Sequence, residues 1–308
     1  MRSIRLFAAL LALMLLSGCS AGRQQPFTAE VLPSPSAEPP RLTVYIASAE
    51  TLADMDIETY VAGVVAGEMP GDWPIEALKA QAILARTFVL KFVTEKDSKY
   101  PGADISTDIS EAQAYDAEAV NERILQAVRE TAGRILLTED GKLPYAWFHS
   151  HSGGMTETAA DGIDWNGEEP AYIRIVPGGE ADDGAWSAAF PVADFIAACR
   201  SAGADVSSCR AVSIAQKGKS GRAVTLSVDG TTVNAARLRL ALGSTVMRST
   251  LLTELTVRDG EVRMAGRGYG HGVGLSQWGA HAMALAGKSA EEIALHYYKG
   301  LRVVRAWE

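Results

Sequence analysis

The sequence predicts an α+β fold: a single mixed domain of helices and strands with a small inserted subdomain. Amphipathic patterns of period 3.6 and alternating patterns of period 2 both occur along the chain. They do not follow one another as regular strand–helix–strand units, which argues against a parallel α/β sheet. The chain has 308 residues, of which 47% are hydrophobic and 21% charged, so it can bury a substantial core.

Charge and cysteine content exclude several classes of protein. The 29 basic and 37 acidic residues give a net charge of −8. Sequence-independent binding to nucleic acid needs clustered Lys and Arg side chains, so we expect no nucleic-acid partner. Three cysteines are too few for a disulfide framework or for a four-cysteine zinc site.

The first residues carry the pattern of a secretory signal. Arg2 and Arg5 precede an apolar stretch at 6–16, which is too short to span a bilayer. The Leu-Ser-Gly-Cys sequence that ends at Cys19 resembles the lipoprotein box of bacteria, which implies cleavage before Cys19 and acylation of that residue. We therefore expect a lipoprotein signal peptide at 1–19 and a lipid anchor at the extracytoplasmic face of the cell membrane. The alternative is an ordinary secretory signal that happens to contain a cysteine.

Composition divides the rest of the chain. Residues 20–40 are rich in Pro, Ser, Ala and Glu, and we expect them to form an extended tether. The domain at 41–308 follows, and its irregular stretch at 162–210 is expected to be an inserted loop or subdomain. In an oxidising compartment Cys199 and Cys209 would either close a small disulfide or stay unpaired, because their spacing does not fix the required geometry.

Glu68 lies on the apolar side of a helix predicted over 57–69, on the same stripe as Ile57 and Val61. Burial and the negative end of the helix dipole both disfavour the carboxylate, so both raise the pKa of Glu68. A carboxyl that stays protonated near neutral pH can act as a general acid. The alternative is a glutamate that reaches water at the helix end or pairs with a nearby Lys or Arg.

Two cations follow on a second predicted helix, which starts at Pro74 because proline suits the first helical position. Lys79 and Arg86 are seven residues apart and therefore share one face. The short turn between the two helices would place both cations near Glu68. There they would either hold a polar substrate or lower the pKa of Glu68, and the pattern does not choose between these roles.

The remaining local patterns predict scaffold. They are a strand at 41–47, an N-cap at Asp56, a helix at 120–132, a hairpin within 212–232 that turns at Asp229-Gly230, a helix at 277–286 with Gly287 after its end, and a final helix with a capping box of Ser289 and Glu292.

Four ordered blocks of sequence resemble the stage II sporulation protein D family, and together they cover the chain from about residue 41 onward. The blocks are YVAGVVAGEMP at 60–70 with WPIEALKAQA at 73–82 and ART at 85–87; FHSHSGGMTE at 148–157; SGR at 220–222 with LG at 242–243 and MRS at 247–249; and GRGYGHGVGLSQWGA at 266–280 with HYYKG at 296–300.

The resemblance implies a peptidoglycan lytic transglycosylase, which cuts between N-acetylmuramic acid and N-acetylglucosamine and leaves a 1,6-anhydro end. Sporulation members act on peptide-stripped glycan strands during engulfment and work with a cell-wall amidase. The family's catalytic acid falls on Glu68. Ordinary glycosidases need two carboxylates. A transglycosylase uses the C6 hydroxyl of the sugar as nucleophile, so one carboxyl can serve first as acid and then as base.

The block at 148–157 offers candidate substrate contacts at His149, Ser150, His151 and Ser152. On a strand the two histidines would point the same way, as metal ligands do. Some relatives appear to hold zinc beside this motif through cysteines, but this chain has no cysteine there. Three interpretations stay open: substrate contacts, a zinc site, and buried structural hydrogen bonders.

The glycine-rich block at 266–280 places further candidate substrate contacts at Tyr269, His271, Gln277 and Trp278. An aromatic plane with amide and imidazole neighbours suits a sugar, because its CH faces stack and its hydroxyls find partners. No cofactor is implied. Two other functions remain: a non-catalytic glycan-binding module that stimulates an amidase, and a zinc-dependent hydrolase that uses His149, His151 and His271.

Overall fold

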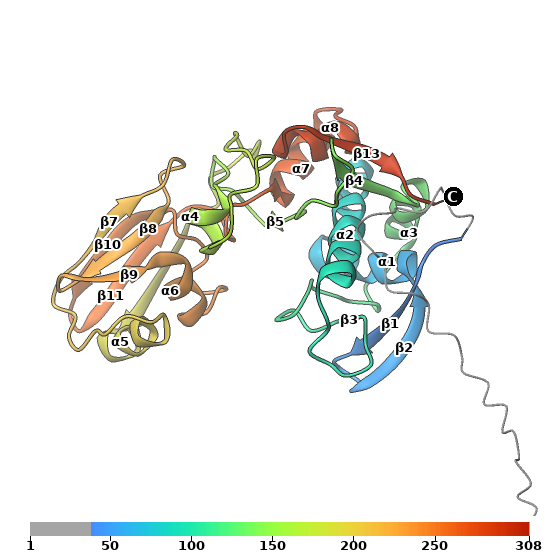
Figure 1. Cartoon of the computed structure of the whole chain (residues 1–308). Coiled ribbons are helices and arrows are strands. Elements are labelled where there is room, and N and C mark those ends of the chain that lie inside the picture. The colour runs from blue at the N-terminus through green and yellow to red at the C-terminus, as the bar shows by residue number, and fades with distance from the viewer. Residues whose placement is uncertain (1–37, 308) are drawn as a thin grey trace, which may run out of the picture.

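The computed structural model describes residues 38–307 and confirms a mixed α+β fold. Figure 1 shows two lobes, and each lobe has its own hydrophobic core. The predicted signal peptide at 1–19, the lipidation site Cys19 and nearly all of the tether at 20–40 lie outside the described residues. Within 38–307 no helix is both long enough and apolar enough to cross a membrane.

The first lobe is built around one long helix. Helix α2 contacts α1, α3, α7 and α8 and strand β4. The core draws on two distant parts of the chain, 42–176 and 275–307. Its elements are α1 (Ile57–Glu68), α2 (Ile75–Glu95), α3 (Glu122–Glu130), α7 (Gln277–Leu285), α8 (Ala290–Tyr297), β1 (Arg41–Ile46), β2 (Thr51–Asp56), β3 (Ile105–Ser106), β4 (Arg134–Thr138), β5 (Phe148–His149), β12 (Leu275–Ser276) and β13 (Leu301–Arg305).

Three small sheets frame these helices. Strand β1 lies between β2, which is antiparallel to it, and β3, which is parallel. Strands β4 and β13 form an antiparallel pair, whereas β5 and β12 form a short parallel pair. These last two pairs tie the middle of the chain to its final segment, and the candidate site depends on that connection.

The predicted helix boundaries are close to those in the structure. Asp56 caps α1 by accepting a hydrogen bond from the Thr59 amide at 2.8 Å. The helix ends one residue earlier than predicted, before Met69, and Pro70 follows. Pro74 is the N-cap of α2 and not its first helical residue. The capping box of the last helix is present as predicted.

The second lobe forms a core from 186 to 264, so the predicted insertion at 162–210 has the wrong limits. The reason is long-range pairing, because β6 pairs with β11, about seventy residues further along the chain. The predicted hairpin is confirmed, with Asp229 and Gly230 both at positive φ in the turn. The elements of this lobe are β6 (Trp186–Pro191), α5 (Val192–Ser201), β7 (Val212–Lys217), β8 (Ala223–Val228), β9 (Thr231–Asn234), α6 (Ala235–Ala241), β10 (Leu252–Arg258) and β11 (Glu261–Gly266), while the short α4 (Ala159–Ile163) precedes it.

Both cysteines of the second lobe are buried free thiols in the structure. Cys199 and Cys209 belong to the same core, and burial raises the pKa of the Cys199 thiol to about 11. The unpaired alternative is therefore the one that the structure contains, and these thiols are protonated near neutral pH.

Arg86 is fully buried, so its predicted role as a substrate contact is wrong. Its guanidinium donates to Glu58 at 2.5 Å from Nη2 and 3.1 Å from Nε. Glu58 also accepts from the amide of Gly133 at 3.0 Å and the indole of Trp307 at 2.9 Å. This ion pair joins α1 and α2 to the final segment of the chain, so its role is structural.

Lys79 has carboxylate partners of its own. Its ammonium lies 2.8 Å from Glu76 and also pairs with Glu130 on α3. These contacts fasten α2 to α3. The structure gives Lys79 no hydrogen bond to Glu68, and the expected meeting of the two cations with that carboxyl does not occur among the described residues.

We predict that Glu58→Gln lowers the free energy of unfolding by about 3 kcal/mol, because the charge of Arg86 would stay buried without its counterion. Urea denaturation measures the loss. The matched control is Glu122→Gln, which removes the partner of Arg129 from an exposed pair and should cost less than about 0.5 kcal/mol. Equal losses in the two variants would contradict the structural role of the buried pair.

Candidate active site

Three segments meet at the carboxyl of Glu68. Glu68 is the half-buried last residue of α1. Its Oε1 accepts a hydrogen bond from the Ala114 amide at 2.9 Å, and its Oε2 accepts one from Nε2 of Gln277 at 3.2 Å. Ala114 belongs to the loop after β3, and Gln277 is the first residue of α7. The structure therefore brings Glu68 together with one of the residues predicted from the glycine-rich block.

Burial is the main influence on the acidity of this carboxyl. It raises the pKa of Glu68 above the ordinary value, and the two hydrogen bonds partly oppose it because they stabilise the charged form. Both donors are neutral. The direction agrees with the sequence prediction, and it favours a carboxyl that can hold its proton closer to neutral pH than an exposed glutamate can.

Two glycines bring the loop onto α1. A Cβ atom at Gly63 would lie 2.2 Å from the Tyr115 ring, and one at Gly67 would lie 2.7 Å from the Tyr115 backbone nitrogen. Only glycine allows so close an approach, and the approach places the Ala114 amide on Glu68. Sequence reasoning missed this loop. The available signal was the four-residue spacing of the glycines, which puts both on one side of the helix.

An aromatic group lies at the start of α7, where the donor Gln277 also lies. Trp278 follows Gln277 on α7, and its side chain is 42% exposed. The Trp278 ring meets the Trp73 ring edge-on with centroids 4.8 Å apart, and His281 lies 4.8 Å from Trp73. An exposed indole supported from the side can stack on the CH face of a sugar. Trp73 and His281 are additions to the predicted set, because ring contacts between segments leave no local pattern.

The histidine block lies next to the start of α7. In the parallel pair of β5 and β12, His149 is opposite Ser276. Just beyond this pair, the carbonyl of Ser150 accepts from the Trp278 amide at 3.0 Å. The predicted contacts of the two blocks are therefore neighbours through their backbones.

His149 and His271 are held by the backbone of Val273. Nδ1 of His149 lies 3.1 Å from the Val273 carbonyl, so it carries the proton, and Nδ1 of His271 accepts from the Val273 amide at 3.0 Å. Burial lowers the pKa of His149 well below its ordinary value and lowers the pKa of His271 to about 3. Both imidazoles are therefore neutral near neutral pH.

This arrangement does not fit a zinc site. One ring nitrogen of each of these two histidines is engaged by the backbone, and the remaining histidine, His151, faces Asp182, with Nε2 3.0 Å from Oδ1. Residues 38–307 contain no group of three or more side chains placed to ligate one metal ion. We derive no step through a metal here.

His151 and Ser152 are buried structural hydrogen bonders, one of the three interpretations that the sequence left open. The amide of His151 donates to the Tyr269 carbonyl, and the return bond has the same length of 2.8 Å. The amide and the hydroxyl of Ser152 both donate to the carboxylate of Glu180, at 2.7 and 2.9 Å. Substrate contact by the side chains of His149, His151 and Ser152 does not fit this burial, whereas Tyr269 is half-buried with Arg248 5.4 Å over its ring.

Comparisons with known proteins point to a family of sporulation proteins. A family model described as stage II sporulation protein matches residues 45–137, and a model for a domain of unknown function matches 191–274. The stage II sporulation protein D of Bacillus subtilis is 29% identical over 88% of this chain and 80% of its own length. An uncharacterized protein of Brachyspira hyodysenteriae is 31% identical over 82% of this chain and 67% of its own length.

The chain belongs to the stage II sporulation protein D family. A protein named amidase enhancer from Bacillus subtilis is also similar, at 27% identity over 77% of this chain and 39% of its own length. Family membership supports a role related to sporulation and the cell wall. The reaction has to be argued from the site itself.

We predict that Glu68→Gln changes how stability depends on pH. Because the pKa of Glu68 is raised in the folded chain, the folded state binds this proton more tightly than the unfolded state. The free energy of unfolding therefore falls as pH rises from about 4.5 through the folded-state pKa. The variant escapes that loss, so it should match the wild type near pH 4 and exceed it near pH 8 in urea denaturation.

The control for this prediction is Glu118→Gln, which changes an exposed carboxylate after the same loop. It should follow the pH dependence of the wild type. A Glu68→Gln variant that also follows the wild type would show that this carboxyl is not held in its neutral form by burial.

Proposed function

We propose that the chain is a peptidoglycan lytic transglycosylase and that Glu68 is its catalytic acid and base. One observation carries the proposal: a partly buried carboxyl with a raised pKa is held by two neutral donors, and the exposed Trp278 directly follows one of them, Gln277, along α7. The substrate would be the bond between N-acetylmuramic acid and N-acetylglucosamine. The product would carry a 1,6-anhydro end.

The chemistry needs one carboxyl that works twice. The protonated Glu68 donates its proton to the glycosidic oxygen while the bond to the muramic acid C1 breaks. The resulting carboxylate then accepts the proton of the C6 hydroxyl as that oxygen bonds to C1, so the enzyme returns to its starting state. The C6 hydroxyl belongs to the same sugar, which gives it a high effective concentration. The hydrogen bonds from Ala114 and Gln277 stabilise the carboxylate between the two steps.

The aromatic group would hold the glycan. We propose that Trp278 stacks on a sugar ring next to the scissile bond, with Trp73 supporting it from the side. Gln277 is buried and would orient Glu68 through its amide. Tyr269, His271 and Ser150 are half-buried and remain candidates for the outer part of the same surface.

The setting of the reaction is proposed from the sequence. Acylation of Cys19 would anchor the domain at the outer face of the cell membrane, with residues 20–40 as its tether. The substrate would be peptide-stripped glycan, supplied by a partner cell-wall amidase that removes the stem peptides. The process would be engulfment during sporulation.

The second candidate function is a glycan-binding module that stimulates an amidase without cutting glycan. The similarity to a protein named amidase enhancer favours it. In that case the exposed surface around Trp278 would bind the strand, and Glu68 would contribute to binding or to stability only. The two functions differ in whether the purified chain releases soluble sugar.

We predict that Glu68→Gln abolishes formation of 1,6-anhydro products, with a loss of at least about 1000-fold, because an amide cannot transfer the proton that the proposed reaction takes from Glu68. Mass spectrometry of products from peptide-free glycan strands measures this. Binding of the variant to insoluble glycan should be retained, and Glu118→Gln should keep full activity. A fully active Glu68→Gln variant would falsify the assignment, whereas a wild-type chain that binds glycan and stimulates an amidase without releasing products would favour the second function.

We predict that Trp278→Ala raises KM for glycan about tenfold and that Trp278→Phe raises it less, because stacking of one ring contributes about 1.4 kcal/mol. The matched control is Leu285→Ala. Leu285 is 69% exposed and lies on the same face of α7 as Trp278, two helical turns further along. Initial rates against glycan concentration separate KM from kcat. Equal KM values for the wild type and Trp278→Ala would remove the indole from the binding surface.

A further inference from the structure

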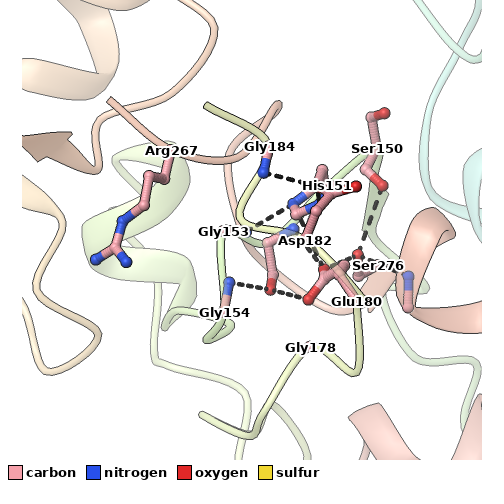
Figure 2. A network of polar contacts seen from close by, with 12 residues as sticks. Ser150, His151, Gly153, Gly154, Gly178, Glu180, Asp182, Gly184, Arg267 and Ser276 are labelled. Atoms are coloured by element: carbon pink, nitrogen blue, oxygen red, sulfur yellow. Dashed lines mark hydrogen bonds and ion pairs between the residues drawn. The ribbon is translucent and has the colours of Figure 1, made fainter. Parts of the chain in front are cut away.

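Glu180 is a buried carboxylate that the proposed reaction does not use. Its side chain is 2% exposed. Oε1 accepts from the Ser152 amide at 2.7 Å and also from the Ser276 hydroxyl, while Oε2 accepts from the Ser152 hydroxyl at 2.9 Å. Nδ1 of His151 is 3.9 Å from Oε1 of Glu180. This nitrogen accepts a hydrogen bond from the Gly153 amide, so it carries no proton that it could donate to Glu180. Figure 2 shows this network.

The donors to this carboxylate are neutral and come from two segments. A buried carboxylate costs free energy unless hydrogen bonds replace the water that it loses, and an apolar side chain of the same size would avoid that cost. The carboxylate does, however, fix the loop of Ser152 and the start of α7 at Ser276 relative to each other. The presence of a carboxylate at this place therefore indicates that Ser152 and Ser276 have to be held in a fixed relative position.

Ser276 connects Glu180 to the candidate acid. As the N-cap of α7, its hydroxyl accepts from the Gly279 amide at 3.3 Å while it donates to Glu180. The next residue, Gln277, donates to Glu68. Because Ser276 and Gln277 are adjacent in the chain, a shift of Ser276 also moves the side-chain amide of Gln277 that donates to Glu68.

We propose that Glu180 is a positioning residue, which holds Ser276 so that Gln277 donates its hydrogen bond to Glu68. The effect on catalysis rests on the proposed function. The hydrogen bonds that connect Glu180 to Glu68 do not depend on it. Glu180 is buried and acts on Glu68 only through Ser276 and Gln277.

The environment of Glu68 shows what the loss of this support would do. The amides of Ala114 and Gln277 stabilise its charged form, and the titratable group in electrostatic contact with it is Tyr60 on the same helix. Burial raises the pKa of Tyr60, so this phenol stays neutral and does not oppose a change. Removal of the Gln277 donor therefore leaves Glu68 with one stabilising hydrogen bond, and its pKa rises further.

The test compares four variants of the whole chain. Glu180→Leu removes both acceptor oxygens and Ser276→Ala removes the hydroxyl, so both break the path, whereas Ser276→Thr keeps a hydroxyl that can cap the helix and donate to Glu180. Ser289→Ala is the matched control, because it removes the N-cap of another helix of the same lobe. Carbon-13 NMR titration of the Glu68 carboxyl, assigned with Glu68→Gln, reports its pKa without any need for catalysis.

We expect the pKa of Glu68 to rise by about 0.5 unit in Glu180→Leu and Ser276→Ala, the equivalent of about 0.7 kcal/mol, and to stay at the wild-type value in Ser276→Thr and Ser289→Ala. The alkaline limb of kcat should shift by the same amount. We also expect kcat to fall about tenfold in the two disrupted variants, with KM nearly unchanged.

The proposal is overturned if Glu180→Leu and Ser276→Ala melt at lower temperature, as Ser289→Ala does, but keep the wild-type pKa of Glu68. If the pKa rises as expected and the wild-type chain forms no 1,6-anhydro products, the positioning role stands and the proposed function fails.

Discussion

The candidate site depends on one hydrogen bond, from the Gln277 amide to the Glu68 carboxyl. These residues belong to α1 and α7, which lie at opposite ends of the sequence and both pack against α2. The buried pair of Arg86 and Glu58 fixes α1 on α2, and the Ser276 cap fixes the start of α7. Much of the first lobe therefore supports the relative position of the Gln277 amide and the Glu68 carboxyl.

Local structure could be predicted well because each signal lies within a few residues. The Asp56 cap, the turn at Asp229-Gly230 and the capping box of Ser289 and Glu292 are short patterns with direct physical causes, and the structure contains all three. Glu68 was found in the same way, since a single carboxylate interrupts an apolar stripe. Its raised pKa follows from that placement.

What the sequence could not supply was the partner of each inward side chain. The spacing of Lys79 and Arg86 indicates a shared face. It does not indicate that Lys79 pairs with Glu76 and Glu130, or that Arg86 pairs with Glu58. The limits of the second lobe depend on pairing between strands far apart in the chain. Glu180 shows no pattern at all, because its donors come from two other segments and it lies inside a stretch predicted to be an irregular insertion.

The chain order of the site also has a consequence for synthesis. Glu68 leaves the ribosome long before Gln277 does, and the whole second lobe is made in between. A nascent chain therefore carries the Glu68 carboxyl before the Gln277 amide, the Trp278 indole and the Ser276 cap exist. The candidate site is complete only after α7 has been made and packed, so a chain truncated before α7 would lack the donor to Glu68.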